Sequence, residues 1–141
     1  MSEAGVEREI GQFIDLYIGR VLTARHRQVS LRGRKCRAAI MHTLLGYEVK
    51  AGRKRITCPD LITARYLRAF AETGVATVRI PYDPTVTRGI VGEIESGLEQ
   101  IRRASGEAPE SCRKAYRRLR QKLQKAEQEQ LSGTLVSQKS P

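Results

Sequence analysis

Residues 3 to 27 carry the pattern that most restricts how this chain can fold. Apolar side chains recur at steps of three and four residues, which places them along one face of an α-helix. Glutamates gather near the start of the segment and arginines near its end, an order that suits the helix dipole. The pattern predicts a long amphipathic helix that must bury one stripe, made of Val6, Ile10, Phe13, Ile14, Tyr17, Ile18, Val21 and Leu22.

The next stretch of the chain is predicted to form a second helix and then a hairpin. The helix would run from residue 34 to residue 45 and end at Gly46, a residue type that commonly terminates helices. The segment YEVKAGRKRIT (47–57) alternates around a turn at Ala51 and Gly52, which is typical of a β-hairpin. The second helix would bury Ala38, Ala39, Ile40, Met41, Leu44 and Leu45.

The remaining segments alternate between helical and strand patterns of hydrophobic residues. VATVRI (75–80) is rich in β-branched residues and is the clearest strand. Helices are predicted over 59–73, 86–104 and 109–131, and residues 132–141 are expected to form a disordered tail. In the last helix only a thin apolar seam is present, made of Cys112, Tyr116, Leu119, Leu123 and Ala126.

This order of segments predicts an α+β fold. The hairpin and the later strand would form one small mixed sheet covered by helices, with a basic C-terminal helix appended. Strand 53–57, helix 59–73 and strand 75–80 would give a right-handed βαβ unit with parallel strands. The predicted organisation is a compact domain over 1–105, the basic helix over 106–131 and the tail over 132–141.

The charge of the chain is strongly positive and unevenly distributed. Lysines and arginines number 26 against 15 aspartates and glutamates, giving a formal net charge of +11. Most of the excess falls in residues 19–55 and 113–125, whereas residues 93–110 are rich in glutamate. Clustered positive charge creates a field that attracts a polyanion, which favours nucleic acid, DNA or RNA, as the partner.

Three basic clusters are candidate phosphate contacts. In the first, Arg34, Lys35 and Arg37 would occupy the first turn of the second helix, where free N–H groups bind anions and added cations are otherwise unfavourable. The alternative is that these cations, and those of the hairpin turn, are simply solvated. The predicted nucleic-acid contacts are Arg25, Arg27, Arg32, Arg34, Lys35, Arg37, Lys50, Arg53, Lys54, Arg55, Arg113, Lys114, Arg117, Arg118 and Arg120.

Aromatic residues argue against recognition by base stacking. The chain has two Phe, five Tyr and no Trp, and Phe13 and Tyr17 already belong to the first helical stripe. Few rings remain to stack on bases, which favours contacts to the phosphate backbone. An alternative function is a protein–protein adaptor with a basic docking surface. Any homo-oligomer is expected to form through the first or the last helix.

A catalytic function is a further alternative, although the sequence leans away from an enzyme. Cys58, Asp60 and Asp83 each follow a predicted strand, and parallel neighbouring strands would bring them together at one edge of the sheet. A thiol at a helix N-terminus would have a lowered pKa, and two aspartates could hold Mg²⁺. The competing interpretation is that Thr57 and Asp60 form a capping box with Pro59 in the first helical turn, and that Asp83 caps a helix starting at Pro84. No cofactor and no metal site is predicted.

Cysteine usage and hydropathy bear on the cellular setting. The three cysteines are odd in number and have no metal-like spacing, which favours a reducing environment. No apolar run approaches the length of about 18 residues that spans a bilayer, and no secretory apolar segment is apparent at the start. The sequence therefore predicts a cytoplasmic protein with no membrane partner.

Overall fold

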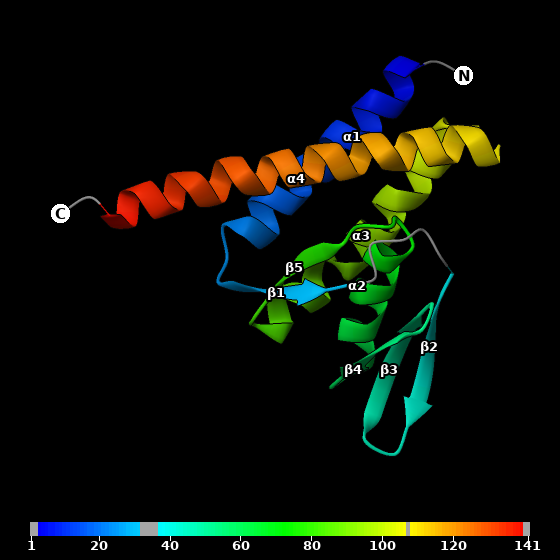
Figure 1. Cartoon of the computed structure of the whole chain (residues 1–141), viewed down its shortest axis with the longest axis vertical. Coiled ribbons are helices and arrows are strands. Elements are labelled where there is room, and N and C mark those ends of the chain that lie inside the picture. Colours follow the sequence, from blue (N-terminus) through cyan, green and yellow to red (C-terminus); the bar gives the residue numbers. More distant parts are fainter. Residues whose placement is uncertain (1–2, 32–36, 107, 140–141) are drawn as a thin grey trace.

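The computed structural model of the protein describes residues 3–31, 37–106 and 108–139. Within them the chain forms helices and two small antiparallel sheets, which confirms the predicted α+β class (Figure 1). In chain order the elements are α1 (Glu3–Tyr17), the π-helical turn η1 (Ile18–Leu22), β1 (His26–Ser30), β2 (Ala38–Thr43), β3 (Gly46–Ala51), β4 (Lys54–Cys58), α2 (Leu61–Ala71), β5 (Thr77–Pro81), α3 (Pro84–Ala104) and α4 (Pro109–Lys139).

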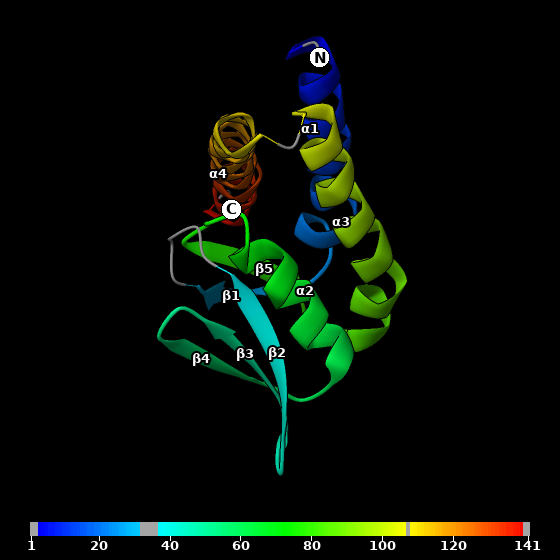
Figure 2. The ribbon, with the colours of Figure 1, turned by 90° about the vertical axis from the view of Figure 1, so that its right-hand side faces the viewer.

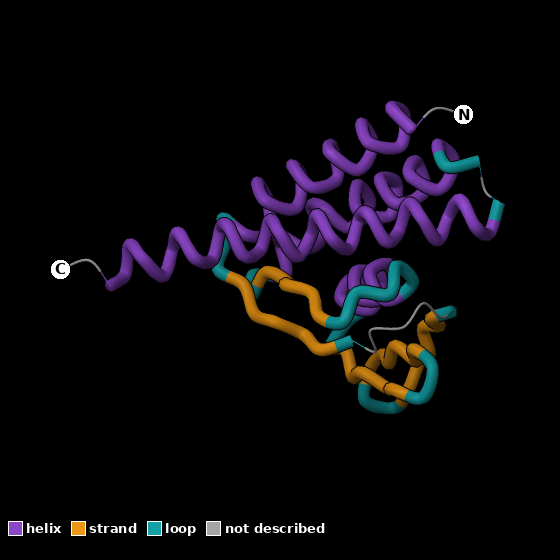
Figure 3. The backbone as a smooth tube through the Cα atoms, turned by 45° about the horizontal axis from the view of Figure 1, so that its top comes forward, coloured by secondary structure: helices purple, strands orange, loops and turns teal. Residues whose placement is uncertain are grey.

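The strands belong to two separate sheets, which Figure 3 shows as two groups of orange strands. β1 pairs antiparallel with β5, from His26 opposite Pro81 to Ser30 opposite Thr77. β2, β3 and β4 form an antiparallel meander in which β3 is the central strand. The predicted hairpin at 47–57 is therefore confirmed, as β3, a turn and β4.

The predicted parallel βαβ unit is wrong. α2 does connect β4 to β5, but β4 pairs antiparallel with β3 and β5 pairs antiparallel with β1. The two strands on either side of α2 thus lie in different sheets instead of side by side. The partner of β5 is β1, whose first two residues, His26 and Arg27, the sequence assigned to the end of the first helix. A short strand there offers β5 an antiparallel neighbour that the sequence pattern did not reveal.

The predicted second helix is also wrong over its described part. Residues 38–43 form strand β2, which pairs with all of β3. Gly46 does not end a helix; it begins β3 with a positive φ of 129°, where a Cβ atom would lie 3.1 Å from the Cys58 carbonyl oxygen. Cross-strand pairing along six residues outweighs the helical preference of Ala38 and Ala39. Leu44 and Leu45, expected to be buried, are 105% and 89% exposed in the turn between the strands.

The first and last helices are largely as predicted. Ile10, Phe13, Tyr17 and Val21 of the predicted stripe are buried, although α1 ends at Tyr17 and η1 continues only to Leu22. The last helix begins at Pro109 as expected but continues to Lys139, through most of the segment predicted to be a tail.

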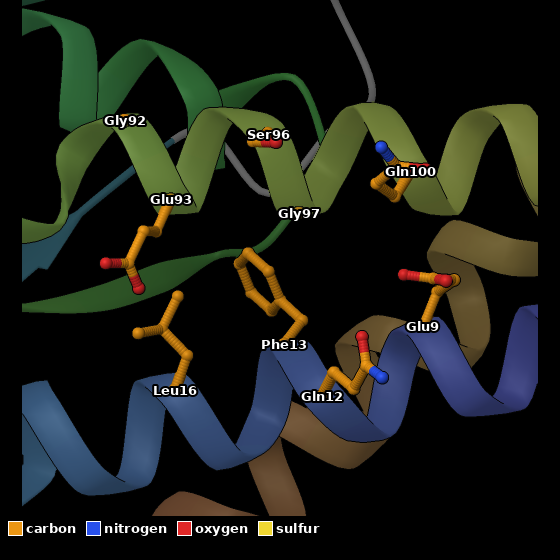
Figure 4. Close-up of a pocket in the computed structure, with 9 residues that line it drawn as sticks. All are labelled: Glu9, Gln12, Phe13, Leu16, Gly92, Glu93, Ser96, Gly97 and Gln100. Atoms are coloured by element: carbon orange, nitrogen blue, oxygen red, sulfur yellow. The ribbon is translucent and has the colours of Figure 1, made fainter.

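In Figure 1, α1 and α4 lie above the strands, whereas α2 packs against the three-stranded sheet. α1 lies beside α3, and α4 crosses α1 and η1 (Figures 1 and 2). The core between them contains a cluster of rings in which the Phe70 centroid lies 5.8 Å from Phe13, 5.7 Å from Tyr17 and 5.0 Å from Tyr66. Figure 4 shows the Phe13 ring pointing from α1 toward Gly97 on α3, where an added Cβ would lie 2.9 Å from the ring. Gly97 therefore permits the close approach of these two helices.

Candidate nucleic-acid interface

Helix α4 separates an apolar seam from a cationic outer ridge. The seam residues Cys112, Ala115, Leu119, Leu123 and Ala126 are buried, and all but Ala115 were predicted from the sequence. With about 100° between successive residues of a helix, the opposite side presents a different set. That set, called here the α4 ridge, is Arg113, Lys114, Arg117 and Lys125, all exposed and without an ion pair to any described residue.

Other polar side chains of α4 hold the helix against the body. Arg118 lies 2.6 Å and Lys122 lies 3.8 Å from the Glu7 carboxylate on α1. Arg120 donates a 2.7 Å hydrogen bond to the carbonyl oxygen of Thr73, and burial, followed by the nearby Arg117 charge, lowers the pKa of Arg120. Arg118 and Arg120, both predicted as phosphate contacts, are therefore engaged within the protein.

Sequence reasoning missed the role of Tyr17 in fixing α4. Its hydroxyl donates a 2.7 Å hydrogen bond to Glu127 of α4 and accepts one of 2.8 Å from the Arg79 backbone N–H in β5. Burial is the main cause that raises the pKa of Tyr17 well above its usual range. The periodicity identified Tyr17 as a core residue, but no local pattern indicates a partner so distant along the chain.

The basic cluster that includes Arg25, Arg27 and Arg37 follows η1 along the chain. The Arg25 guanidinium lies over the exposed Tyr82 ring, 5.4 Å from its centroid. Arg27 in β1 and Arg37 before β2 are exposed and make no ion pair with a described residue. Because Arg37 precedes a strand, the predicted anion site at a helix N-terminus is wrong as far as it involves this residue. Arg32, Arg34 and Lys35 lie outside the described residues.

The basic cluster of the hairpin surrounds the turn between β3 and β4. Lys50 and Arg55 are paired across the two strands, and Arg55 lies 3.6 Å from Glu48 on the same face of the sheet. Arg53 is exposed in the turn, and Lys54 is half-buried at the start of β4. Arg55 is therefore partly neutralised, whereas Lys50, Arg53 and Lys54 have no ionic partner among the described residues.

The elements that carry these clusters lie on one side of the molecule. In Figure 2, α4, β1 and the turn between β3 and β4 lie to the left, whereas α2 and α3 lie to the right. The arginines of α2 and α3 that flank their glutamates are neutralised locally. Arg65 forms a bidentate pair with Glu95, Arg68 lies 3.7 Å from the same carboxylate, and Arg102 and Arg103 lie 2.5 Å and 3.2 Å from Glu99.

The residues considered for catalysis have structural partners. The Asp60 side chain accepts a 2.7 Å hydrogen bond from the Thr63 N–H and is the N-cap of α2; Asp83 accepts one of 2.9 Å from the Thr85 N–H and is the N-cap of α3. The cap predicted at Asp83 is thus confirmed. The predicted capping box is wrong, because Thr57 lies in β4 and Asp60 is itself the N-cap of α2, which begins at Leu61. Burial raises the pKa of the Cys58 thiol to about 11, the opposite of what a nucleophile requires. The parallel edge expected to gather these residues does not form.

Two other kinds of site, a metal centre and a membrane-spanning helix, are absent from the described ranges. No group of three or more His, Cys, Asp or Glu side chains is arranged to hold a metal ion there. Among the same residues, no helix combines the length and the apolar character needed to cross a bilayer.

No protein-family model matches the chain, and neither a curated protein nor a solved structure shows significant similarity to it.

Proposed function

We propose that this protein binds the phosphate backbone of nucleic acid through the α4 ridge, with β1 and the turn between β3 and β4 supplying further cations. The observation that carries the proposal is the contrast in ion pairing. Four of the five arginines of α2 and α3, all except Arg88, share the carboxylates of Glu95 and Glu99, whereas the cations of the α4 ridge have no carboxylate partner among the described residues. Unpaired, clustered arginines attract phosphate, and the planar guanidinium can bind it with two hydrogen bonds.

The length of the α4 ridge fits several successive phosphates. From Arg113 to Lys125 the helix rises about 18 Å at about 1.5 Å per residue. Duplex DNA rises about 3.4 Å per base pair, so the ridge spans roughly five base pairs. A straight, rigid helix of this kind can follow a nucleic-acid backbone without reading its bases.

The aromatic side chains support a backbone-directed mode. Both phenylalanines, Phe13 and Phe70, are buried, as are Tyr17 and Tyr66. Tyr82 is 56% exposed but lies under the Arg25 guanidinium. Because few rings are available to stack on bases, binding is proposed to depend on charge and duplex shape with little dependence on base sequence.

The test is a salt titration of binding by the full chain. Fluorescence anisotropy with labelled duplex DNA, duplex RNA and single strands should show tight binding at low salt. If about six phosphates are engaged, log K should fall with log salt at a slope near −5. Binding that is absent at low salt, or whose affinity does not change with salt, would overturn the proposal.

A competition experiment distinguishes the proposed function from that of an adaptor for acidic proteins. Unlabelled duplex of unrelated sequence should displace the labelled probe at the same concentration as the probe sequence itself. Polyglutamate of equal charge should compete much more weakly, because carboxylates on a flexible chain do not reproduce the phosphate spacing of a duplex. Stronger competition by polyglutamate would favour an acidic protein as the partner.

A further inference from the structure

Strand β2 forms an edge of the three-stranded sheet and lies at the outside of the molecule. Among the described residues it pairs only with β3, so the backbone groups along its other side have no strand partner. In Figure 1, β2 is the outermost strand on the right, and in Figure 2 the same strand faces the viewer with nothing drawn in front of it. An edge strand of this kind is a template for pairing with another strand.

The two edges of this sheet differ in how they are protected. β4, the opposite edge, carries Lys54 and Arg55, and Arg53 precedes it; charges of this kind discourage edge-to-edge association. β2, with the sequence AAIMHT, has no lysine, arginine, aspartate, glutamate or proline, and Arg37 precedes it. Its Met41 is 42% exposed, and the turn that follows presents the fully exposed Leu44 and Leu45. The molecule therefore protects one edge and leaves the other apolar.

We propose that β2 pairs antiparallel with β2 of a second copy of this chain, joining two three-stranded sheets into one of six strands. The pairing follows a two-fold axis, the commonest symmetry of homodimers. Opposed residues of an antiparallel pair lie on the same face of the sheet. Centring the axis on Met41 satisfies this rule, since it places the two Met41 side chains together and each Ala39 opposite the partner's Thr43. Each leucine turn then lies beside the first residues of the other β2.

The distribution of charge restricts where a second copy of this chain can bind. Two chains of net charge +11 repel each other over most of their surfaces. β2 and the leucine turn are a part of the surface where two copies can meet without placing like charges opposite each other. Nucleic acid is a poor occupant for the same reason, because residues 38–45 provide no lysine or arginine for phosphate. This inference does not depend on the proposed function.

The experiment measures the oligomeric state of the full chain without nucleic acid, by sedimentation equilibrium over a wide range of concentration. The wild-type chain is expected to be a dimer that dissociates on dilution. Met41→Lys places two lysines against each other at the axis and should raise the dimer dissociation constant by about tenfold or more. Replacing Leu44 and Leu45 with serine should weaken the dimer in the same direction.

Thr57→Lys is the matched control. Met41 and Thr57 flank Glu48 on either side in the same row of the sheet, one on each edge strand. Both variants therefore place one lysine beside the same carboxylate, and circular dichroism checks that both are folded. The control should leave the dimer intact. A wild-type chain that is monomeric at all concentrations, a Met41→Lys chain that dimerises normally, or equal weakening by Thr57→Lys would each overturn the proposal.

Discussion

The two sides of this molecule both carry arginines but use them differently. Arg65 and Arg68 of α2 pair with Glu95 and so join α2 to α3, and Arg102 and Arg103 pair with Glu99 within α3. On α4, Arg118 and Lys122 at the margin of the helix pair with Glu7, and the cations of the α4 ridge pair with no residue that the structure describes. The contrast shows that a strongly positive net charge indicates a polyanion partner only where the counter-charges are missing.

The α4 ridge carries a cost in the free protein. Arg113 and Arg117 are separated by four residues, and Lys114 and Arg117 by three, so like charges are neighbours on the helix surface. Each such pair is unfavourable by about 0.2–0.5 kcal/mol. A phosphate backbone placed along the ridge would remove this repulsion, which is the physical reason to expect that a polyanion stabilises α4.

The strongest test of the difference between the two sides is to remove equal positive charge from each. Replacing Arg113, Lys114 and Arg117 with glutamine should reduce the salt slope by about 2.7, at about 0.9 per lost phosphate contact. At moderate salt the affinity for duplex DNA should fall roughly a hundredfold. Fluorescence anisotropy across a salt series measures both quantities.

The matched control removes three arginines from α3. Replacing Arg88, Arg102 and Arg103 with glutamine changes the net charge by the same amount on the opposite side. Affinity and salt slope should remain close to those of the wild-type chain. An equal loss in both variants would show that only total charge matters and that the two sides do not differ in function.

The sequence predicted elements well where one period dominated a long segment. The stripe from Ile10 to Val21, the strand at 75–80 and the cap at Asp83 all have local signals, and the structure confirms each of them. The errors fall where short segments read equally well as helix or strand. Residues 38–43 became a strand because β3 offered a partner, and partnership is a tertiary property that no local pattern contains.

The candidate interface was predictable in composition but not in geometry. Clustering in the sequence identified the cations of α4, and the seam at Leu119 and Leu123 fixed which side of the helix is buried. The sequence could not distinguish Arg117, which has no ionic partner within the described ranges, from Arg118, which pairs with Glu7 more than a hundred residues away. That distinction depends on how α4 crosses α1, and it follows only from packing.

The attachment of α4 to the body offers a second, smaller test. Tyr17→Phe removes the hydroxyl that joins Arg79 and Glu127, and it leaves the Arg79 N–H without this partner. The free energy of unfolding should fall by about 1–3 kcal/mol, as measured by urea denaturation. Glu127→Gln keeps an oxygen that accepts the hydrogen bond and should cost much less. If both variants are equally destabilised, the charge of Glu127 holds α4 rather than the hydrogen bond.

Tyr17 also predicts that the stability of the fold depends on pH. Burial raises the pKa of Tyr17, so the folded chain keeps the phenol protonated at pH values where the unfolded chain, with a pKa of about 10, ionises it. The unfolded state then binds fewer protons, and stability falls as pH rises above about 10. Urea titrations between neutral and alkaline pH should show a smaller loss in Tyr17→Phe than in the wild-type chain. An identical loss would contradict the assignment.

The smallest expected effects are changes in stability caused by alanine substitutions at Gly92 and Gly97 of α3. A Cβ on Gly97 would lie 2.9 Å from the Phe13 ring, whereas a Cβ on Gly92, on the same helix, would meet no atom within 4 Å. Gly92→Ala should therefore stabilise the protein by up to about 1 kcal/mol through helix propensity alone. Gly97→Ala gains the same propensity but must displace a buried ring, at a cost of about 1–3 kcal/mol.

Thermal unfolding of the two alanine variants gives the sign of each change, and nucleic-acid affinity gives its location. Gly97→Ala should unfold at a lower temperature than Gly92→Ala yet bind duplex DNA with unchanged affinity and salt slope, because α1 and α3 pack on the side away from the α4 ridge. If the Gly97 variant also loses affinity, then the packing of α1 against α3 sets the position of α4. In that case the packing of α1 against α3 and the binding of nucleic acid by α4 would be coupled, and the proposed separation between the two sides would be wrong.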